Sequence, residues 1–286
     1  MQNVANSNQT FNYSTDYFNC LENEWSRISH PIIQELIEKL YAGKLQSPVN
    51  DILDFGCGNG LYSGTLGKLC HNLYGVDVSE NAILNSAKTN NYKELKLSNG
   101  TTIPFRDESF DMIFSTEVLE HIENTGLILS ELFRVLKPNG HLILTTTLYS
   151  HSIYTYIAQS KIQSHHLIFI LKQLFSYLRG YYSPAIQEKF IRRWCFSPLG
   201  GHYHGFHQKQ LLSSIDKVGF KIVESPVFYA YSPIPLLHSG DYAYVKKKSF
   251  LKKIVLLPVA SLIKMFNYIC IRSGRFANNI FIICKK

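Results

Sequence analysis

The sequence predicts an α/β protein with a doubly wound, mostly parallel sheet. Two observations lead to this fold class. Short apolar runs alternate with segments whose apolar residues recur at helical spacing, which is typical of strands joined by crossover helices. Polar residues also follow several apolar runs, and open sheets of this kind bind ligands beyond the carboxyl ends of their strands. The 286 residues are enough for one large domain with a full core.

The elements can be placed in order along the chain. Ser79 precedes a helical segment as a helix start, and Gly219 closes another as a helix end. Seven strands are expected, at 51–55, 72–77, 94–98, 111–115, 140–147, 220–224 and 279–284. Helices are expected within 11–47 and at 60–70, 80–90, 125–137, 161–178 and 207–218.

The most informative segment is Asp54-Phe55-Gly56-Cys57-Gly58-Asn59-Gly60, a predicted glycine-rich turn between a strand and a helix. Glycine lets the backbone turn tightly and approach a ligand closely. The pattern is G-x-G-x-G with an acid two residues before the first glycine, whereas a dinucleotide fold requires G-x-G-x-x-G. Because an acid here repels a pyrophosphate and suits a cationic sulfonium with an amino-acid tail, the loop predicts S-adenosylmethionine as the cofactor.

A second acid, Asp77, ends the next strand, 17 residues after Gly60. A carboxylate at this place accepts hydrogen bonds from both ribose hydroxyls of an adenosine. This feature alone fits NAD as well, so the loop spacing separates the two cofactors.

Further motifs follow in order: Ile103-Pro104-Phe105, Ser109 to Ser115, Glu117-Val118-Leu119-Glu120-His121-Ile122 and Arg134 to Leu144. This succession resembles the class I S-adenosylmethionine-dependent methyltransferases, in particular the small-molecule branch that includes ubiquinone-biosynthesis enzymes. The resemblance is close over residues 50–147 and looser over 202–225.

The resemblance implies a Rossmann-like fold in which the sixth and seventh strands pair and the seventh runs antiparallel. Residues 1–286 then form one methyltransferase domain. Its parts are N-terminal helices or lid at 1–49, a cofactor-binding core at 50–147, a basic aromatic cap at 148–206, and a C-terminal part at 207–286 with an amphipathic insertion at 226–278.

The resemblance also assigns cofactor contacts. Asp54 would face the amino group of the methionine tail, and Asp77 would hold the ribose diol. Asn99 stands where the family usually has an acid on the adenine amino group, and its amide oxygen can accept the same hydrogen bond. Thr116 would line the methionine end. The full expected set is Asp54, Gly56, Gly58, Gly60, Asp77, Asn99 and Thr116.

The catalytic candidates are histidines. His121 ends the E-x-x-E-H-I run, where holding a helix end is an equal alternative to catalysis. His202 and His204 lie in the segment before the helix at 207–218, and His207 is expected to cap that helix. No carboxylate or thiolate lies close in sequence to His202, His204 and His207, so no metal site is predicted. Tyr17 and Trp25 belong either to a lid or to ordinary helix packing.

Charge is distributed unevenly. Residues 1–140 carry 10 Lys/Arg and 17 Asp/Glu, whereas residues 141–286 carry 19 and 4. This asymmetry suggests an anionic partner. Lys246 to Lys253 precede an apolar stretch at 254–271, which predicts either a helix in an anionic membrane surface or a helix on the protein's own core. A polar start without an apolar segment and six cysteines without a C-x-x-C pair predict a cytoplasmic protein with reduced thiols.

The sequence therefore predicts methyl transfer from S-adenosylmethionine to a small or lipid-linked acceptor, expected to be anionic, at the membrane surface. An RNA methyltransferase is the enzymatic alternative, although no RNA-binding module is recognisable. A cofactor-binding scaffold without turnover is the non-enzymatic one. The acceptor atom and the oligomeric state are left open.

Overall fold

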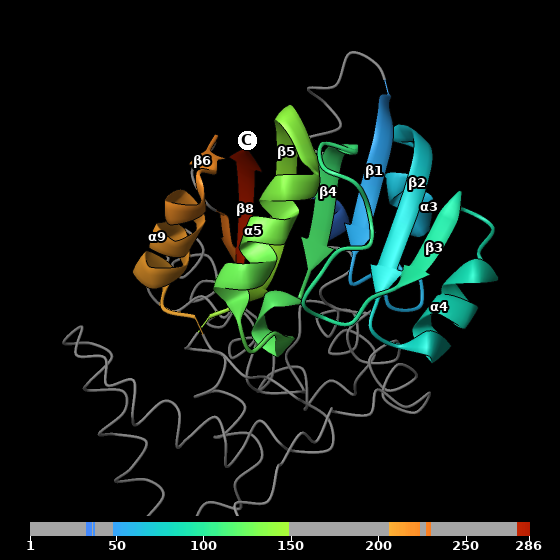
Figure 1. The fold of residues 1–286 in the computed structure, drawn as a ribbon, viewed down its shortest axis with the longest axis horizontal. Coiled ribbons are helices and arrows are strands. Elements are labelled where there is room, and N and C mark those ends of the chain that lie inside the picture. Colours follow the sequence, from blue (N-terminus) through green and yellow to red (C-terminus); the bar gives the residue numbers. More distant parts are fainter. Residues whose placement is uncertain (1–32, 36, 38–47, 149–205, 224–226, 230–278) are drawn as a thin grey trace, which may run out of the picture.

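The computed structural model describes residues 33–35, 37, 48–148, 206–223, 227–229 and 279–286. Within them one sheet runs through the molecule (Figure 1). Its strands lie in the order β3-β2-β1-β4-β5-β8-β6, and β7 also pairs with β8. Their bounds are β1 Val49–Phe55, β2 Cys70–Asp77, β3 Glu94–Leu97, β4 Phe110–Thr116, β5 Leu136–Thr147, β6 Lys221–Ile222, β7 Val227–Tyr229 and β8 Asn279–Lys285.

The strand directions match the predicted fold class. Strands β1 to β5 pair in parallel, whereas β8 is antiparallel to β5, β6 and β7. In Figure 1 the arrows of β2 and β4 point one way and the arrow of β8 points the other way. The doubly wound, mostly parallel sheet is confirmed, and so is the antiparallel last strand. The short strand β7 lies inside the segment predicted to be a pure insertion.

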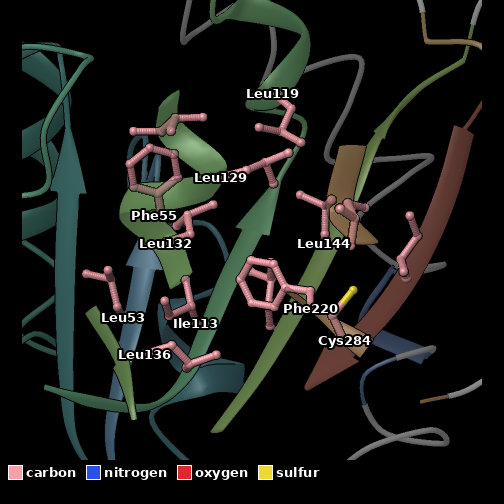
Figure 2. Packing of buried hydrophobic residues seen from close by; sticks show 14 of the residues in the cluster. Leu53, Phe55, Ile113, Leu119, Leu129, Leu132, Leu136, Leu144, Phe220 and Cys284 are labelled. Atoms are coloured by element: carbon pink, nitrogen blue, oxygen red, sulfur yellow. The ribbon is translucent and has the colours of Figure 1, made fainter. Parts of the chain in front are cut away.

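Hydrophobic clusters cover both faces of the sheet. On one face the helices α5 (Thr125–Val135) and α9 (Gln208–Val218) contribute Leu132 and Ile215 to a core with Leu53 and Leu144. Figure 2 shows Leu129 and Leu132 of α5 packed among the strand residues Phe55 and Ile113. On the other face Ile33, Ile37 and Leu66 pack with Met112 and Phe114. Burial on both faces explains the nearly continuous apolar runs of the central strands.

Helix boundaries follow local chemistry. Ser79 accepts a hydrogen bond from Ala82 N–H at the start of α4 (Glu80–Ala87), and Asn124 does the same from Leu127 N–H at the start of α5. Gly219, with φ +110°, ends α9. His207 occupies the N-cap position of α9, but its side chain makes no capping hydrogen bond. The capping role expected for His207 is therefore wrong.

Two elements differ in length from the prediction. Helix α3 (Ser63–Leu66) has only four residues, because Gly60 with φ +79° turns the chain before it and β2 begins at Cys70. Strand β5 begins at Leu136, earlier than expected, because the ladder with β4 continues through a bulge that contains Asn139 at φ +65°.

Candidate functional site

The carboxyl edge of the sheet brings the predicted site residues together. Phe55 of β1 pairs with Val76 of β2 and Ser115 of β4, so the residues that follow these three strands lie side by side at the carboxyl edge of the sheet. Asp77 pairs with Leu97 of β3, which places the next turn at the same edge. The predicted cofactor residues of the described chain therefore converge on one edge of the sheet, as expected for this fold class.

The glycine loop needs its glycines. Gly56, Gly58 and Gly60 have φ values of +74°, +52° and +79°, a region that side chains disfavour. A Cβ added to Gly56 would lie 2.3 Å from Cγ2 of Val118. The loop therefore combines a left-handed backbone with close packing against its neighbours.

Asp77 links the loop to the end of β2. Gly58 N–H donates to its Oδ2 and Ser79 N–H to its Oδ1, each at 2.9 Å. Burial raises the pKa of Asp77, while these N–H groups counteract the rise. Each carboxylate oxygen can accept more than one hydrogen bond, so both can still receive ribose hydroxyls. The predicted ribose contact fits this geometry and stays a prediction.

Asp54 lies near the end of β1, two residues before the first glycine of the loop, and is almost completely buried. The hydroxyl of Tyr92 donates to its Oδ2 at 2.6 Å. Burial raises the pKa of Asp54 to about 7, the Tyr92 hydrogen bond opposes this rise, and the charge of Asp77 adds to it. A carboxyl group in this state gains from a cationic partner, in agreement with its predicted place beside the amino group of the methionine tail.

Asn99 and Thr116 have different surroundings. Oδ1 of Asn99 accepts hydrogen bonds from the backbone N–H and hydroxyl groups of Thr101 and Thr102, at 2.9–3.0 Å. An adenine amino group would compete with these four donors, so the described geometry favours a turn-holding role for Asn99.

Oγ1 of Thr116 is buried without a partner in the described structure, and the contact with the methionine end stays a prediction.

A polar cluster next to this site was missed by the sequence reasoning. Thr145 Oγ1 and Asn279 Nδ2 donate to the two carboxylate oxygens of Glu117, at 2.9 and 2.7 Å. Thr146 Oγ1 donates to Oε2 of the fully buried Glu120 at 2.7 Å. The cluster lies where β4 and β5 end and β8 begins. The E-x-x-E-H-I run was a usable signal for the two acids, whereas no local pattern marks Asn279.

The polar cluster contains the buried side-chain atoms that lack a hydrogen-bond partner within the described residues: Ser115 Oγ, Thr116 Oγ1, Glu120 Oε1, Thr147 Oγ1 and Asn279 Oδ1. Burial raises the pKa of Glu120 far above its ordinary value, and the neighbouring Glu117 carboxylate raises it further. Both effects favour the neutral form of Glu120. These atoms are free to form further hydrogen bonds, to an ordered water molecule or to a ligand.

Of the three candidate catalytic histidines, only His121 lies among the described residues. His121 ends the short helix η2 (Leu119–His121), where its backbone N–H donates to the carbonyl oxygen of Val118 at 3.0 Å. His202 and His204 lie outside the described residues, as do Tyr17 and Trp25. Their predicted roles stay predictions.

A doubly wound sheet with a glycine loop after its first strand and an acid after its second defines the Rossmann-like class of nucleoside-cofactor-binding proteins. Residues 53–144 match the family described as methyltransferase domain. These findings identify the region around the glycine loop as a class I S-adenosylmethionine-dependent methyltransferase domain.

Similar proteins agree with this family. The chain is 26% identical over 125 residues to a probable S-adenosylmethionine-dependent methyltransferase of Mycolicibacterium smegmatis, a match that covers 44% of this chain and 46% of that protein. It is 32% identical over 123 residues to a ubiquinone biosynthesis O-methyltransferase of Rickettsia typhi, covering 42% and 50%. The matches thus span half or less of these two relatives.

Among solved structures, an S-adenosylmethionine-dependent methyltransferase from Mesorhizobium loti superimposes with a TM-score of 0.53. The identity is 15%, and the superposition covers 88% of this chain and 97% of that one. This similarity shows the fold.

Proposed function

We propose that the protein transfers a methyl group from S-adenosylmethionine to a hydroxyl group of a small or lipid-linked acceptor. The observation that carries the proposal is the hydrogen bond from Gly58 N–H to Asp77 Oδ2, which ties the glycine loop to the acid at the end of β2. This arrangement offers a carboxylate to a ribose and a side-chain-free backbone to the rest of the cofactor. The similarity to methyltransferases over residues 53–144 supports the same assignment.

The residues have separate tasks in this proposal. S-adenosylmethionine supplies an activated methyl group on a sulfonium, so the protein has to position the acceptor in line and exclude water. Asp77 orients the nucleoside through the ribose, and Asp54 holds the cationic end of the amino-acid tail. The glycines at 56, 58 and 60 let the backbone come close to the ligand between these two acids.

The acceptor side of the site is proposed to be the polar cluster around Glu117 and Glu120. An acceptor hydroxyl loses its proton during transfer, so a base at this edge assists the reaction. His121, His202 and His204 are the bases that the sequence predicts, and Glu117 joins them because Thr145 and Asn279 hold its carboxylate at the same edge. The similarity to a ubiquinone biosynthesis O-methyltransferase supports an oxygen acceptor.

Product analysis tests this function. The purified protein is incubated with S-adenosylmethionine and with lipid or polar extracts, and the extracts are searched by mass spectrometry for a species heavier by one methylene. We expect such a product to appear with the parent protein and to be absent without the cofactor. Cofactor binding without any methylated product in either extract would instead indicate a scaffold without turnover.

The membrane part of the proposal rests on the sequence at 246–271, which lies outside the described residues. In the described part, none of the helices combines the length and apolarity needed to cross a bilayer. We propose reversible attachment, in which each of the five lysines at 246–248 and 252–253 adds about 1 kcal/mol near an anionic surface.

Vesicle flotation tests the attachment. The parent protein should bind vesicles of phosphatidylglycerol and phosphatidylcholine at low salt and leave them as salt rises, because exposed charges are screened. Changing the five lysines to glutamine should abolish this binding while cofactor affinity stays unchanged. A parent protein that does not bind such vesicles at low salt would contradict the attachment and favour a soluble acceptor.

A further inference from the structure

Asp54 is a buried carboxyl group with a single described partner. Its side chain is 3% exposed, and the Tyr92 hydroxyl donates to Oδ2 at 2.6 Å. None of the salt bridges among the described residues includes Asp54, and in this part of the chain Oδ1 receives no hydrogen bond. A buried carboxyl group with one donor and no cation is costly unless a ligand supplies the missing partner.

Tyr92 reaches Asp54 because two glycines leave room for its ring. Tyr92 lies in the turn before β3, 38 residues after Asp54. A Cβ added to Gly75 of β2 would lie 3.0 Å from the ring atom Cε1, and a Cβ added to Gly60 would lie 3.3 Å from Cε2. The ring therefore packs against β2 and the glycine loop, and both lack a side chain at the point of contact.

The groups around Asp54 add negative rather than positive charge. The charge of Asp77 on β2 adds to the raised pKa of Asp54. Burial is the main cause of the raised pKa values of Cys57 in the loop and of Tyr62 before α3, and the charge of Asp54 raises both further. Glu117, which follows β4, also raises the pKa of Tyr62, so a further negative charge lies near the group that Asp54 affects. The Tyr92 hydroxyl is the group that favours the ionised form of Asp54.

We propose that Tyr92 is a positioning residue for the cofactor: its hydroxyl holds Oδ2 of Asp54 so that Oδ1 receives the ammonium group of S-adenosylmethionine. This inference rests on the proposed function and adds a pH dependence to it. Below neutral pH Asp54 carries a proton, which the incoming ammonium has to displace, so the affinity falls as pH falls. Without the Tyr92 donor the protonated form persists to higher pH, and the loss of affinity begins at a higher pH.

Calorimetric titration with S-adenosylmethionine between pH 6 and 8.5 tests the inference. In the parent we expect the affinity to fall by up to tenfold per pH unit below neutral, with a proton released on binding. In Tyr92→Phe this fall should begin about one pH unit higher, giving a loss of up to about tenfold at pH 7 that largely disappears at pH 8.5. A purely structural role would lower the affinity equally at every pH.

Two further variants serve as controls. Tyr74→Phe removes a hydroxyl from a ring that packs on Phe105 and Phe110 and should leave the profile unchanged. Asp54→Asn cannot titrate and shows the pH dependence that belongs to the ligand alone, so it also tests the inference if Tyr92→Phe does not fold. Profiles of Tyr92→Phe or Asp54→Asn that coincide with the parent profile would overturn the inference alone. A parent protein that binds no S-adenosylmethionine would overturn the proposed function together with it.

Discussion

The two edges of the sheet use their acidic residues in opposite ways. At the amino edge the acids have cationic partners: the described salt bridges there are Arg134–Asp107, Arg134–Glu131, Lys137–Asp51, Lys137–Asp111 and Lys286–Glu108. At the carboxyl edge Asp54, Asp77 and Glu120 are buried without any of these cations. The pKa of Glu131 is lowered by its partner, whereas the pKa values of the three buried acids are raised.

The amino edge therefore stabilises the fold, whereas the carboxyl edge keeps groups that a ligand can use. Paired and partly exposed charges at the amino edge hold the loops and the end of α5. Buried carboxyl groups without cations lower the stability of the fold, and such groups are retained where a ligand or a reaction needs them. Variants at the two edges should therefore separate stability from cofactor binding.

Gly56→Ala should have the largest effect. The new Cβ would meet Cγ2 of Val118 at 2.3 Å on a backbone with φ +74°, which combines overpacking with left-handed strain and costs about 2–4 kcal/mol. We expect loss of cofactor binding and a lower melting temperature. Adding Val118→Ala should recover the part of the loss that is due to the clash. A Gly56→Ala protein that binds the cofactor normally would contradict the role of the loop.

Arg134→Met should lower stability without touching the cofactor site. Arg134 donates to Glu131, Asp107 and the carbonyl oxygens of Ile103 and Phe105 at 2.7–3.0 Å. Its side chain is 30% exposed, so water replaces part of these bonds, and we expect a loss of about 1–2 kcal/mol in urea unfolding. The exposed neighbour Arg106, changed to Met, is the control and should change nothing. Loss of cofactor affinity in the folded Arg134→Met protein would contradict the view that the amino edge contributes to stability and not to cofactor binding.

Glu120→Gln should show the smallest effect of the three variants, and this effect should grow as pH rises above about 4.5. The pKa of Glu120 in the folded protein lies above its ordinary value of 4.5, so its contribution to stability is complete below that value. The contribution is lost as pH rises through the raised pKa, at a limit of about 1.4 kcal/mol per pH unit. Glutamine stays neutral, and the variant should therefore gain on the parent in denaturant unfolding as pH rises above about 4.5, until the raised pKa of Glu120 is passed. The exposed Glu80, changed to Gln, should show no such gain.

Local patterns in the sequence were sufficient for most of the sheet and for the edge at which the expected cofactor residues lie. Apolar periodicity located the parallel strands, and the G-x-G-x-G turn with Asp77 indicated the cofactor edge, because each of these features lies within a few consecutive residues. Strand β7 and the early start of β5 escaped prediction, since a short edge strand and a bulge depend on the partner strand rather than on local sequence.

The remainder of the site depends on pairs that are distant in sequence. Tyr92 meets Asp54 across 38 residues, and Asn279 meets Glu117 across 162. Neither pair leaves a spacing that a single sequence reveals. For Asn99 the family position suggested an adenine contact, and the structure adds that Thr101 and Thr102 donate hydrogen bonds to its amide oxygen. The adenine contact stays a prediction.

The central claim is that the carboxyl edge binds S-adenosylmethionine through Asp77. Calorimetry of the parent protein, of Asp77→Ala and of the exposed control Asp107→Ala, each titrated with S-adenosylmethionine and with NAD, tests it most directly. We predict that the parent and the control bind S-adenosylmethionine equally and do not bind NAD. In folded Asp77→Ala the affinity should fall by about 1.5–3 kcal/mol, the range for hydrogen bonds to a charged group. Tight NAD binding by the parent, or an unchanged affinity in Asp77→Ala, would contradict the claim.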